Sequence, residues 1–158
     1  MIRLLSTLFL VIAVGLAACS SDNGGGCKDI GGSIVYGEDG IPEVQGELTT
    51  TASCLQIIEV EIGEGDAAQA GERVSVHYTG YLEDGTIFDD SVQRGEPIAF
   101  SLERVIQGWQ EGIPGMQVGG MRRLIVPAKL ASGTFAFGPS VPPNATLIFD
   151  VQLLELIR

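Results

Sequence analysis

The side chains that ordinarily perform acid–base, nucleophilic or metal chemistry are few in this chain of 158 residues. His77 is its one histidine, and its three cysteines lie at positions 19, 27 and 54. The sequence contains no zinc-type Cys/His spacing, no phosphate-binding glycine loop and no Gly-x-Ser-x-Gly nucleophile motif. We therefore expect no metal and no other cofactor, and we interpret His77 as a structural residue.

Aromatic residues are more informative, because they make up only 6% of the chain. From Arg73 onward apolar and polar residues alternate, which predicts a strand with Tyr78 on its apolar face. Phe149 lies in a second alternating segment. It shares one face with Leu147, Val151 and Leu153, opposite Asp150 and Gln152. Tyr78 and Phe149 are both expected to point into a core or a cleft.

The elements that must position these side chains are mostly strands. Residues 55–60 read as a strand that ends at a glycine-rich turn, and Met121–Val126 reads as another. A single short helix is predicted around Ile106 to Gly112, where glycine and proline residues would stop it. The predicted class is α+β, with a largely antiparallel sheet and one short helix.

Four segments follow one another in a fixed order between Val76 and Leu156: VHYTGYLEDGTIFDDS, VIQGWQEGI, GGMRRLIVP and VPPNATLIFDVQLLEL. Together they resemble the FKBP-type peptidyl-prolyl cis-trans isomerases, over residues 55–158. The resemblance implies a curved antiparallel sheet wrapped around one short α-helix, with an apolar pocket between them. It also implies rotamase activity, the acceleration of rotation about X-Pro bonds, for which no proton transfer is needed.

The resemblance also assigns the pocket residue by residue. It implies a catalytic set made of Tyr78, Phe88, Asp89, Ile106, Trp109 and Phe149, with Trp109 as the floor and Asp89 as the polar wall. Val105 joins the residues that bind substrate. For each aromatic the alternative is ordinary core packing. Asp89, which is followed by Asp90, could instead cap a turn or face solvent.

This chain departs from the family pattern at several pocket positions. Ser132 stands where many members have a tyrosine whose hydroxyl binds a substrate carbonyl, and we expect the serine not to reach that carbonyl. Ile98 replaces a frequent pocket phenylalanine, and Phe137 and Val141 are expected to rebuild the upper wall. We expect modest activity and a shifted affinity for macrolide ligands.

Residues 1–18 are predicted to be a targeting segment. Arg3 precedes an apolar run that is shorter than the ~20 residues needed to span a bilayer. The run ends Leu-Ala-Ala-Cys, which resembles a bacterial lipoprotein signal in which Cys19 carries acyl chains such as palmitate. An ordinary secretory signal with an incidental cysteine is the alternative. Residues 19–26 would form a flexible tether. A serine directly after the cysteine, here Ser20, resembles the lipoproteins that are sent to the outer membrane. We therefore expect the domain to be anchored there and to face the periplasm.

Residues 27–54 form an extension to which the sequence assigns no chemistry. Export would place Cys27 and Cys54 where disulfides persist, so we expect a bridge between them, with two free thiols as the alternative. The closed loop would restrict the unfolded chain.

Composition limits the partners. With 9 basic and 20 acidic residues, the chain is not expected to bind nucleic acid. We expect a monomer that acts on proline-containing polypeptides and attaches to a membrane through Cys19. The alternative function is a chaperone or peptide-binding module with little or no turnover. A purely structural spacer would have no need of a lined cleft.

Overall fold

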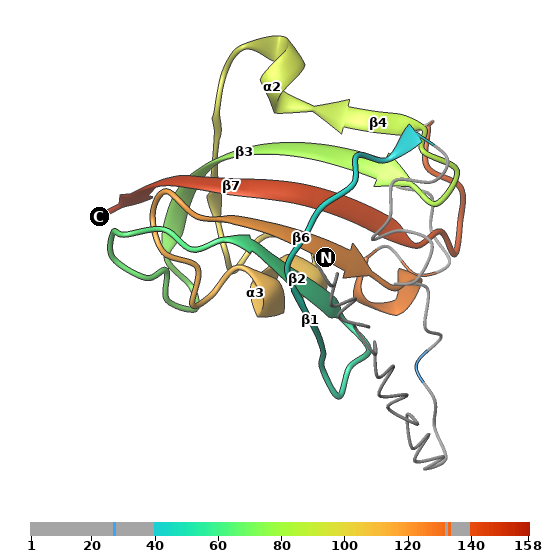
Figure 1. Ribbon diagram of the computed structural model, residues 1–158, viewed down its shortest axis with the longest axis horizontal. Coiled ribbons are helices and arrows are strands. Elements are labelled where there is room, and N and C mark those ends of the chain that lie inside the picture. Colours follow the sequence, from blue (N-terminus) through green and yellow to red (C-terminus); the bar gives the residue numbers. More distant parts are fainter. Residues whose placement is uncertain (1–26, 28–39, 132, 134–139) are drawn as a thin grey trace, which may run out of the picture.

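The strands predicted from alternating apolar residues are present, and they form one antiparallel sheet (Figure 1). The computed structural model describes residue 27 and residues 40–131, 133 and 140–158. The described strands are β1 (Glu47–Thr50), β2 (Gln56–Glu61), β3 (Arg73–Leu82), β4 (Ile87–Asp90), β5 (Ile98–Ser101), β6 (Met121–Val126) and β7 (Leu147–Ile157). Their order is β1-β2-β6-β7-β3-β4, and β5 also pairs with β3. The predicted targeting segment, the tether with Cys19, and the positions Ser132 and Phe137 lie outside the described residues.

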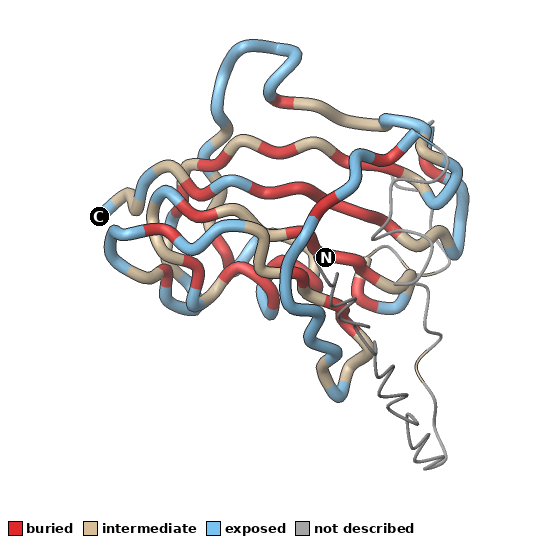
Figure 2. The backbone as a smooth tube through the Cα atoms, viewed as in Figure 1, coloured by how far each residue is buried: buried red, intermediate tan, exposed pale blue. Residues whose placement is uncertain are grey.

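The two longest strands, β3 and β7, pair along their length and carry the centre of the core. Tyr78 lies opposite Val151 in this register. The inward faces that the sequence predicted are confirmed, because Val74, Val76 and Tyr78 of β3 and Leu147, Phe149, Val151 and Leu153 of β7 are all buried. Figure 2 shows this burial concentrated in the middle strands of the sheet.

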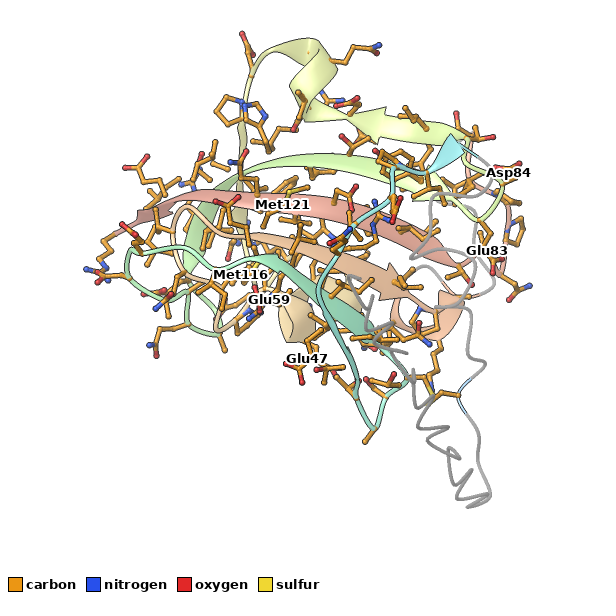
Figure 3. The ribbon with its side chains drawn as sticks, in the orientation of Figure 1. Glu47, Glu59, Glu83, Asp84, Met116 and Met121 are labelled. Atoms are coloured by element: carbon orange, nitrogen blue, oxygen red, sulfur yellow. A yellow bond between two sulfur atoms is a disulfide. The ribbon has the colours of Figure 1, made fainter. Side chains whose placement is uncertain are left out.

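One face of the sheet is covered by the helix α3 (Gln107–Gly112), which lies within the range predicted for it. Its contact with β6 is close: a Cβ on Gly108 would lie 2.4 Å from a Val126 methyl carbon. Glycine there lets the helix approach the sheet. Met116, in the turn after α3, is buried in the same core (Figure 3).

The opposite face of the sheet carries a second apolar cluster that the sequence did not predict. Residues 40–46 run across this face toward β1 (Figure 1). The cluster is made of Ile41, Val44, Ile58, Tyr81, Ile125 and Ile148. The extension therefore buries apolar side chains of its own against the sheet.

A buried ion pair lies beside this second cluster. Arg123 donates two hydrogen bonds to Asp150, at 2.6 and 2.7 Å, and a third to the Pro42 carbonyl at 2.8 Å. The sequence placed Asp150 on the polar face, and it does face away from the main core. It is nevertheless buried, with 8% of its surface exposed, because the extension lies over that face.

The sheet begins before residue 55, the position at which the sequence predicted the start of the domain. The edge strand β1 pairs with β2 in an antiparallel register from Glu47 opposite Glu59 to Thr50 opposite Gln56. Figure 3 shows Glu47 and Glu59 on this side of the sheet. Part of the extension therefore belongs to the sheet.

A disulfide joins Cys27 to Cys54, with Cα atoms 5.2 Å apart. The cysteines are 27 residues apart in sequence, so the bridge ties the start of the extension to the loop between β1 and β2.

A hairpin turn at residues 83–86 joins β3 to β4, and Glu83 and Asp84 lie at its end of the sheet (Figure 3). Asp84 accepts a hydrogen bond from the Thr86 amide at 3.0 Å, as aspartate commonly does in turns. After β4 comes α2 (Ser91–Arg94), and η2 (Ala128–Leu130) follows β6. No helix within the described ranges combines the length and apolar character needed to cross a bilayer.

Candidate functional site

A cavity of about 320 Å³ lies between α3 and the strands β3, β4, β5 and β7. Its lining is apolar apart from two charged residues. The lining residues are Tyr78, Phe88, Asp89, Phe100, Arg104, Val105, Ile106, Trp109 and Phe149. Cavities of this size, with apolar walls and few polar groups, are typical of ligand sites.

Trp109 of α3 forms the centre of an aromatic cluster. Its ring lies 5.1 Å from that of Tyr78, 5.4 Å from that of Phe100 and 5.3 Å from that of Phe149, each in an edge-to-face arrangement. Such geometry places the positive ring edges against the negative ring faces. Its indole Nε1 is buried without a hydrogen-bond acceptor among the described residues. The floor of the cavity is therefore a closely packed aromatic surface.

Phe88 of β4 forms a side wall. Its ring lies edge-to-face with that of Phe149, 5.6 Å away. The ring passes directly over Gly80 of β3, where an added Cβ would come within 2.6 Å of the Phe88 Cζ. Any larger residue at position 80 would displace this ring, so Gly80 is required for the shape of the cavity.

Asp89 forms the polar wall and accepts hydrogen bonds from the Tyr78 hydroxyl and the Arg94 guanidinium. Burial, the hydrogen bond to Asp89 and the charge of this carboxylate together raise the pKa of Tyr78 to about 12. For Asp89, burial opposes ionisation, but the hydrogen bonds from Tyr78 and Arg94 and the guanidinium charge outweigh it and lower the carboxyl pKa. At neutral pH this wall thus presents a neutral phenol and a carboxylate, and the Arg94 guanidinium holds the carboxylate from α2.

The adjacent acid, Asp90, has a different role. Its side chain accepts hydrogen bonds from the amides of Val92 and Gln93, at 2.8 and 3.0 Å, and so forms the N-cap of α2. Capping was one alternative that the sequence left open for Asp89. The structure assigns the cap to Asp90 and leaves Asp89 on the cavity wall.

The other predicted site residues differ in position. Tyr78, Phe88, Val105, Ile106, Trp109 and Phe149 all lie on the cavity wall together with Asp89. Ile98 and Val141 do not line the cavity; Ile98 packs against the main core, and Val141 is buried inside it. Ser132 and Phe137 lie outside the described residues.

Three residues of the site were not identified from the sequence. Phe100 lies in β5 two residues after Ile98 and opposite Val74 of β3, so the strand period placed it on an apolar face and could have identified it. Arg104 lines the cavity, and Arg94 holds Asp89 from α2. For these two arginines the sequence carries no local signal, because their positions depend on how α2 and the segment before α3 pack beside the sheet.

A larger hollow of about 590 Å³ lies on the opposite face of the sheet. It is lined by Pro42, Glu43, Val44, Gln45, Val60, His77, Tyr78, Thr79, Tyr81, Val92, Met121, Asp150 and Gln152. Two titratable residues of this hollow already have partners. Asp150 pairs with Arg123, and His77 Nδ1 lies 3.1 Å from the Ser91 hydroxyl. We take the smaller aromatic cavity as the site, since the described lining of the larger hollow contains no comparable aromatic cluster.

The described side chains of the site are suited to non-covalent contacts. In the described part of the chain, no three His, Cys, Asp or Glu side chains gather in a way that could hold a metal ion. The cavity wall offers apolar contact, a phenol, one carboxylate that is already hydrogen-bonded and, at its edge, the guanidinium of Arg104. Such an arrangement can bind and desolvate a small apolar group, such as a five-membered ring.

Comparison with known proteins gives a consistent result. The family model described as FKBP-type peptidyl-prolyl cis-trans isomerase matches residues 64–154. The FKBP-type 22 kDa peptidyl-prolyl cis-trans isomerase of Escherichia coli is 46% identical over 110 residues, which cover 70% of this chain and 53% of that protein. An FK506-binding protein of Neisseria meningitidis serogroup B is 44% identical over 104 residues, covering 65% of this chain and 95% of that protein.

Among solved structures, the crystal structure of FkpA from Escherichia coli matches with a TM-score of 0.66 and 43% identity, covering 71% of this chain and 52% of that one. The chain thus spans about half the length of these two Escherichia coli proteins.

Proposed function

Because this chain belongs to the FKBP-type peptidyl-prolyl cis-trans isomerase family, a family of enzymes, we propose that its aromatic cavity is the place where it accelerates rotation about X-Pro bonds. The fold of the described residues is the fold of that family, a curved antiparallel sheet with a short helix against one face. The single observation that carries the proposal is the cavity itself, because seven of the pocket residues predicted from the sequence line one apolar space.

The chemistry that this cavity must perform is the twisting of an amide. Resonance in the C–N bond gives a rotation barrier of roughly 18–20 kcal/mol, so the uncatalysed exchange of an X-Pro bond takes tens of seconds or longer. The planar amide is polar and prefers water, whereas the twisted amide has lost its resonance and its charge separation. A cavity that excludes water therefore favours the twisted form over the planar form.

The rings supply this environment. The proline ring would enter over the indole of Trp109, between the walls made by Phe88 and Phe149, and the packing of these rings holds the cavity open. A thousandfold acceleration corresponds to about 4 kcal/mol of differential stabilisation. Shape complementarity and one or two hydrogen bonds are sufficient for a difference of this size.

Asp89 would act through its position on the wall. Its carboxylate is held by Tyr78 and Arg94, so it stays ionised and its orientation is fixed. No proton transfer is required of it. We propose that it orients the phenol and presents a fixed dipole toward the twisting amide.

The proposed substrates are proline-containing segments of exported proteins, and the proposed location is the cell envelope. The sequence features behind this are the apolar segment 1–18 and Cys19, which would anchor the chain to a membrane through acyl chains, with the outer membrane as the proposed site. The Cys27–Cys54 bridge is consistent with such a compartment. The Neisseria relative is named for binding FK506, and we propose that macrolides of that kind enter the same cavity.

A second candidate function is a peptide-binding or chaperone module of the same fold with little turnover. The observation that favours it is Ser132, which replaces the tyrosine that many family members use to hold a substrate carbonyl. Losing one hydrogen bond weakens binding by roughly 1 kcal/mol, which would reduce catalysis without abolishing it.

The test is a protease-coupled or proline-limited refolding assay on residues 27–158, comparing wild type with Phe88→Ala and Asp89→Ala. We expect wild type to accelerate exchange and Phe88→Ala to lower kcat/KM roughly tenfold, since it removes a ring contact from the wall. Ile87→Ala is the matched control, because Ile87 is the neighbouring residue of β4, is 53% exposed and does not line the cavity.

The two candidate functions give different results. If wild type does not accelerate exchange while proline-containing peptides still change the emission of Trp109, the one tryptophan in the chain, then the protein is a binding module. If Phe88→Ala and Ile87→Ala behave alike, catalysis does not take place in this cavity.

A further inference from the structure

The charges on the cavity wall are not equivalent. Among the described residues that line the cavity, only Asp89 and Arg104 carry a formal charge at neutral pH. Asp89 is already occupied by the Tyr78 hydroxyl and the Arg94 guanidinium. Arg104 forms no ion pair with any residue in the described ranges, and it is exposed at the edge of the cavity. In the described part of the wall, one charge therefore has no ion-pair partner, and it is positive.

The backbone that carries Arg104 is held in place. The Arg104 amide donates to the Ser101 carbonyl at 2.9 Å, and the Gln110 side chain donates to the Val105 carbonyl at 2.8 Å. The preceding acid, Glu103, does not neutralise the arginine. Its carboxylate lies near Gly71, where a Cβ would be 3.2 Å from its Oε1. The backbone at Arg104 is thus fixed beside the cavity. The guanidinium has no ion-pair partner among the described residues and can contact a ligand.

From these observations we infer that Arg104 determines part of the enzyme's substrate preference. It selects polypeptides that carry an aspartate or glutamate at one of the two positions before the proline. This inference rests on the proposed function, because it concerns the same cavity. A proline ring seated over Trp109 fills the apolar part of the cavity. The residues that flank it must then pass over the rim, where Arg104 lies.

The negative net charge of the chain means that attraction of an acidic residue would come from Arg104 itself. The chain has a net charge of -11, so its general field repels acidic peptides. A local guanidinium can still attract one carboxylate at short range, and guanidinium geometry suits a bidentate contact. The preference should therefore depend on this single residue rather than on the overall charge of the protein.

The test uses the full chain, purified in detergent, and a series of N-acetylated proline peptides that differ only in one flanking residue, Glu, Gln or Lys. The quantity measured is the kcat/KM ratio between the Glu and Gln peptides within each protein, so a general change in activity cancels. We expect wild type to prefer Glu by about two- to fivefold, the size typical of an exposed ion pair. Arg104→Gln should bring the ratio near one, and Arg104→Glu should reverse it in favour of Lys.

The matched control is Arg158→Glu, which changes the net charge by the same amount as Arg104→Glu. Arg158 is paired with Asp66 at the surface and does not line the cavity. It should keep the wild-type ratio, and the wild-type preference should shrink as salt rises from about 0.01 to about 0.5 M, as screening of exposed charges requires. Equal ratios in wild type, Arg104→Gln and Arg104→Glu would overturn the inference.

Failure of the proposed function would be recognised separately. If no peptide is isomerised faster than in buffer, catalysis is refuted, but the same peptides can be titrated against the emission of Trp109. A Glu-over-Gln ratio of dissociation constants that depends on Arg104 would then support the inference for a binding site. A ratio that does not depend on Arg104 would overturn it.

Discussion

At the scale of single residues, the cavity wall combines groups whose protonation is controlled by one another. Tyr78 donates to Asp89, and Arg94 donates to the same carboxylate. The phenol pKa is raised and the carboxyl pKa is lowered, so both groups keep their neutral-pH forms over a wide range. This mutual stabilisation allows a carboxylate to sit on the wall of an apolar cavity without accepting a proton.

The raised pKa of Tyr78 gives a measurable result. With a pKa of about 12, Tyr78 should remain a phenol at about pH 11, where an ordinary tyrosine with a pKa near 10 is mostly ionised. Removing it by Tyr78→Phe should therefore change the phenolate absorbance of the folded protein very little at that pH. Because the folded pKa is the higher one, the contribution of Tyr78 to stability is full below about pH 10 and is lost as pH rises through about 12.

Asp89→Asn is the control for this assignment. It removes the carboxylate charge that opposes ionisation of the phenol, so the pKa of Tyr78 should fall and phenolate absorbance in the same alkaline buffer should rise. No change in absorbance on Asp89→Asn would show that burial alone controls this tyrosine.

At the scale of elements, α2 is a four-residue helix whose position matters for the site, because it carries Arg94. Asp90→Ala removes the acceptor for the amides of Val92 and Gln93, and we expect a loss of about 1 kcal/mol in the free energy of unfolding. Since Arg94 follows in the same helix, prolyl isomerase activity should fall as well. Urea denaturation and the coupled assay would measure the two effects.

Asp90→Ser provides the matching rescue, because serine also accepts hydrogen bonds as an N-cap. It should recover most of the stability and activity that Asp90→Ala loses. Equal losses in the two variants would mean that Asp90 acts through something other than the cap.

The segment before β1 is a second element whose attachment can be tested. Arg123 is fully buried, pairs with Asp150 through two hydrogen bonds and also holds the Pro42 carbonyl of this segment. Asp150→Ala would leave a buried guanidinium without its carboxylate, and we expect the free energy of unfolding to fall by about 3–5 kcal/mol. Arg158→Ala breaks an exposed ion pair and should cost about 1 kcal/mol or less.

Urea denaturation followed by far-ultraviolet circular dichroism compares these variants. If Asp150→Ala and Arg158→Ala lose similar amounts of stability, the buried pair does not hold the segment as the structure indicates. A double replacement of Arg123 and Asp150 by leucine should lose less than Asp150→Ala, because it leaves no unpaired charge in the interior.

At the scale of the whole molecule, the extension is part of the fold at both of its ends. Cys27 is bridged to Cys54, and residues 40–50 pack on the sheet and add its edge strand. A loop of 27 residues closed by a disulfide restricts the unfolded chain by about 3–4 kcal/mol on the loop-entropy model. We expect Cys27→Ser with Cys54→Ser to lower the free energy of unfolding by about that amount.

The bridge itself is checked by mass spectrometry of the oxidised and reduced protein. Reducing agent should destabilise wild type and leave the double serine variant unchanged. Free thiols in the purified, unreduced protein would refute the bridge, and the alternative of two unpaired cysteines would then hold.

The sequence alone determined the family, the inner faces of two strands and most of the cavity lining. Alternation along a strand requires that every second residue share a face, so the sequence by itself places Tyr78 and Phe149 on the inner face of the sheet, where both are buried. Four motifs in order predicted the family, and it was confirmed. Seven predicted residues proved to line one cavity, because strand period and family spacing are local properties of the chain.

Only the tertiary structure decided the rest, because the remaining features depend on contacts between residues distant in sequence. Asp150 reads as a solvent-facing residue from its alternation, yet the crossing of residues 40–46 buries it against Arg123. The family spacing predicted Asp89 for the cavity wall but left capping open as its alternative, and only the tertiary contacts closed that alternative: Asp89 accepts the hydrogen bond from Tyr78, and Asp90 caps α2. Arg104 lines the cavity only because its segment packs beside the sheet. Sequence period determines which way a side chain faces, whereas what it meets there is decided by packing.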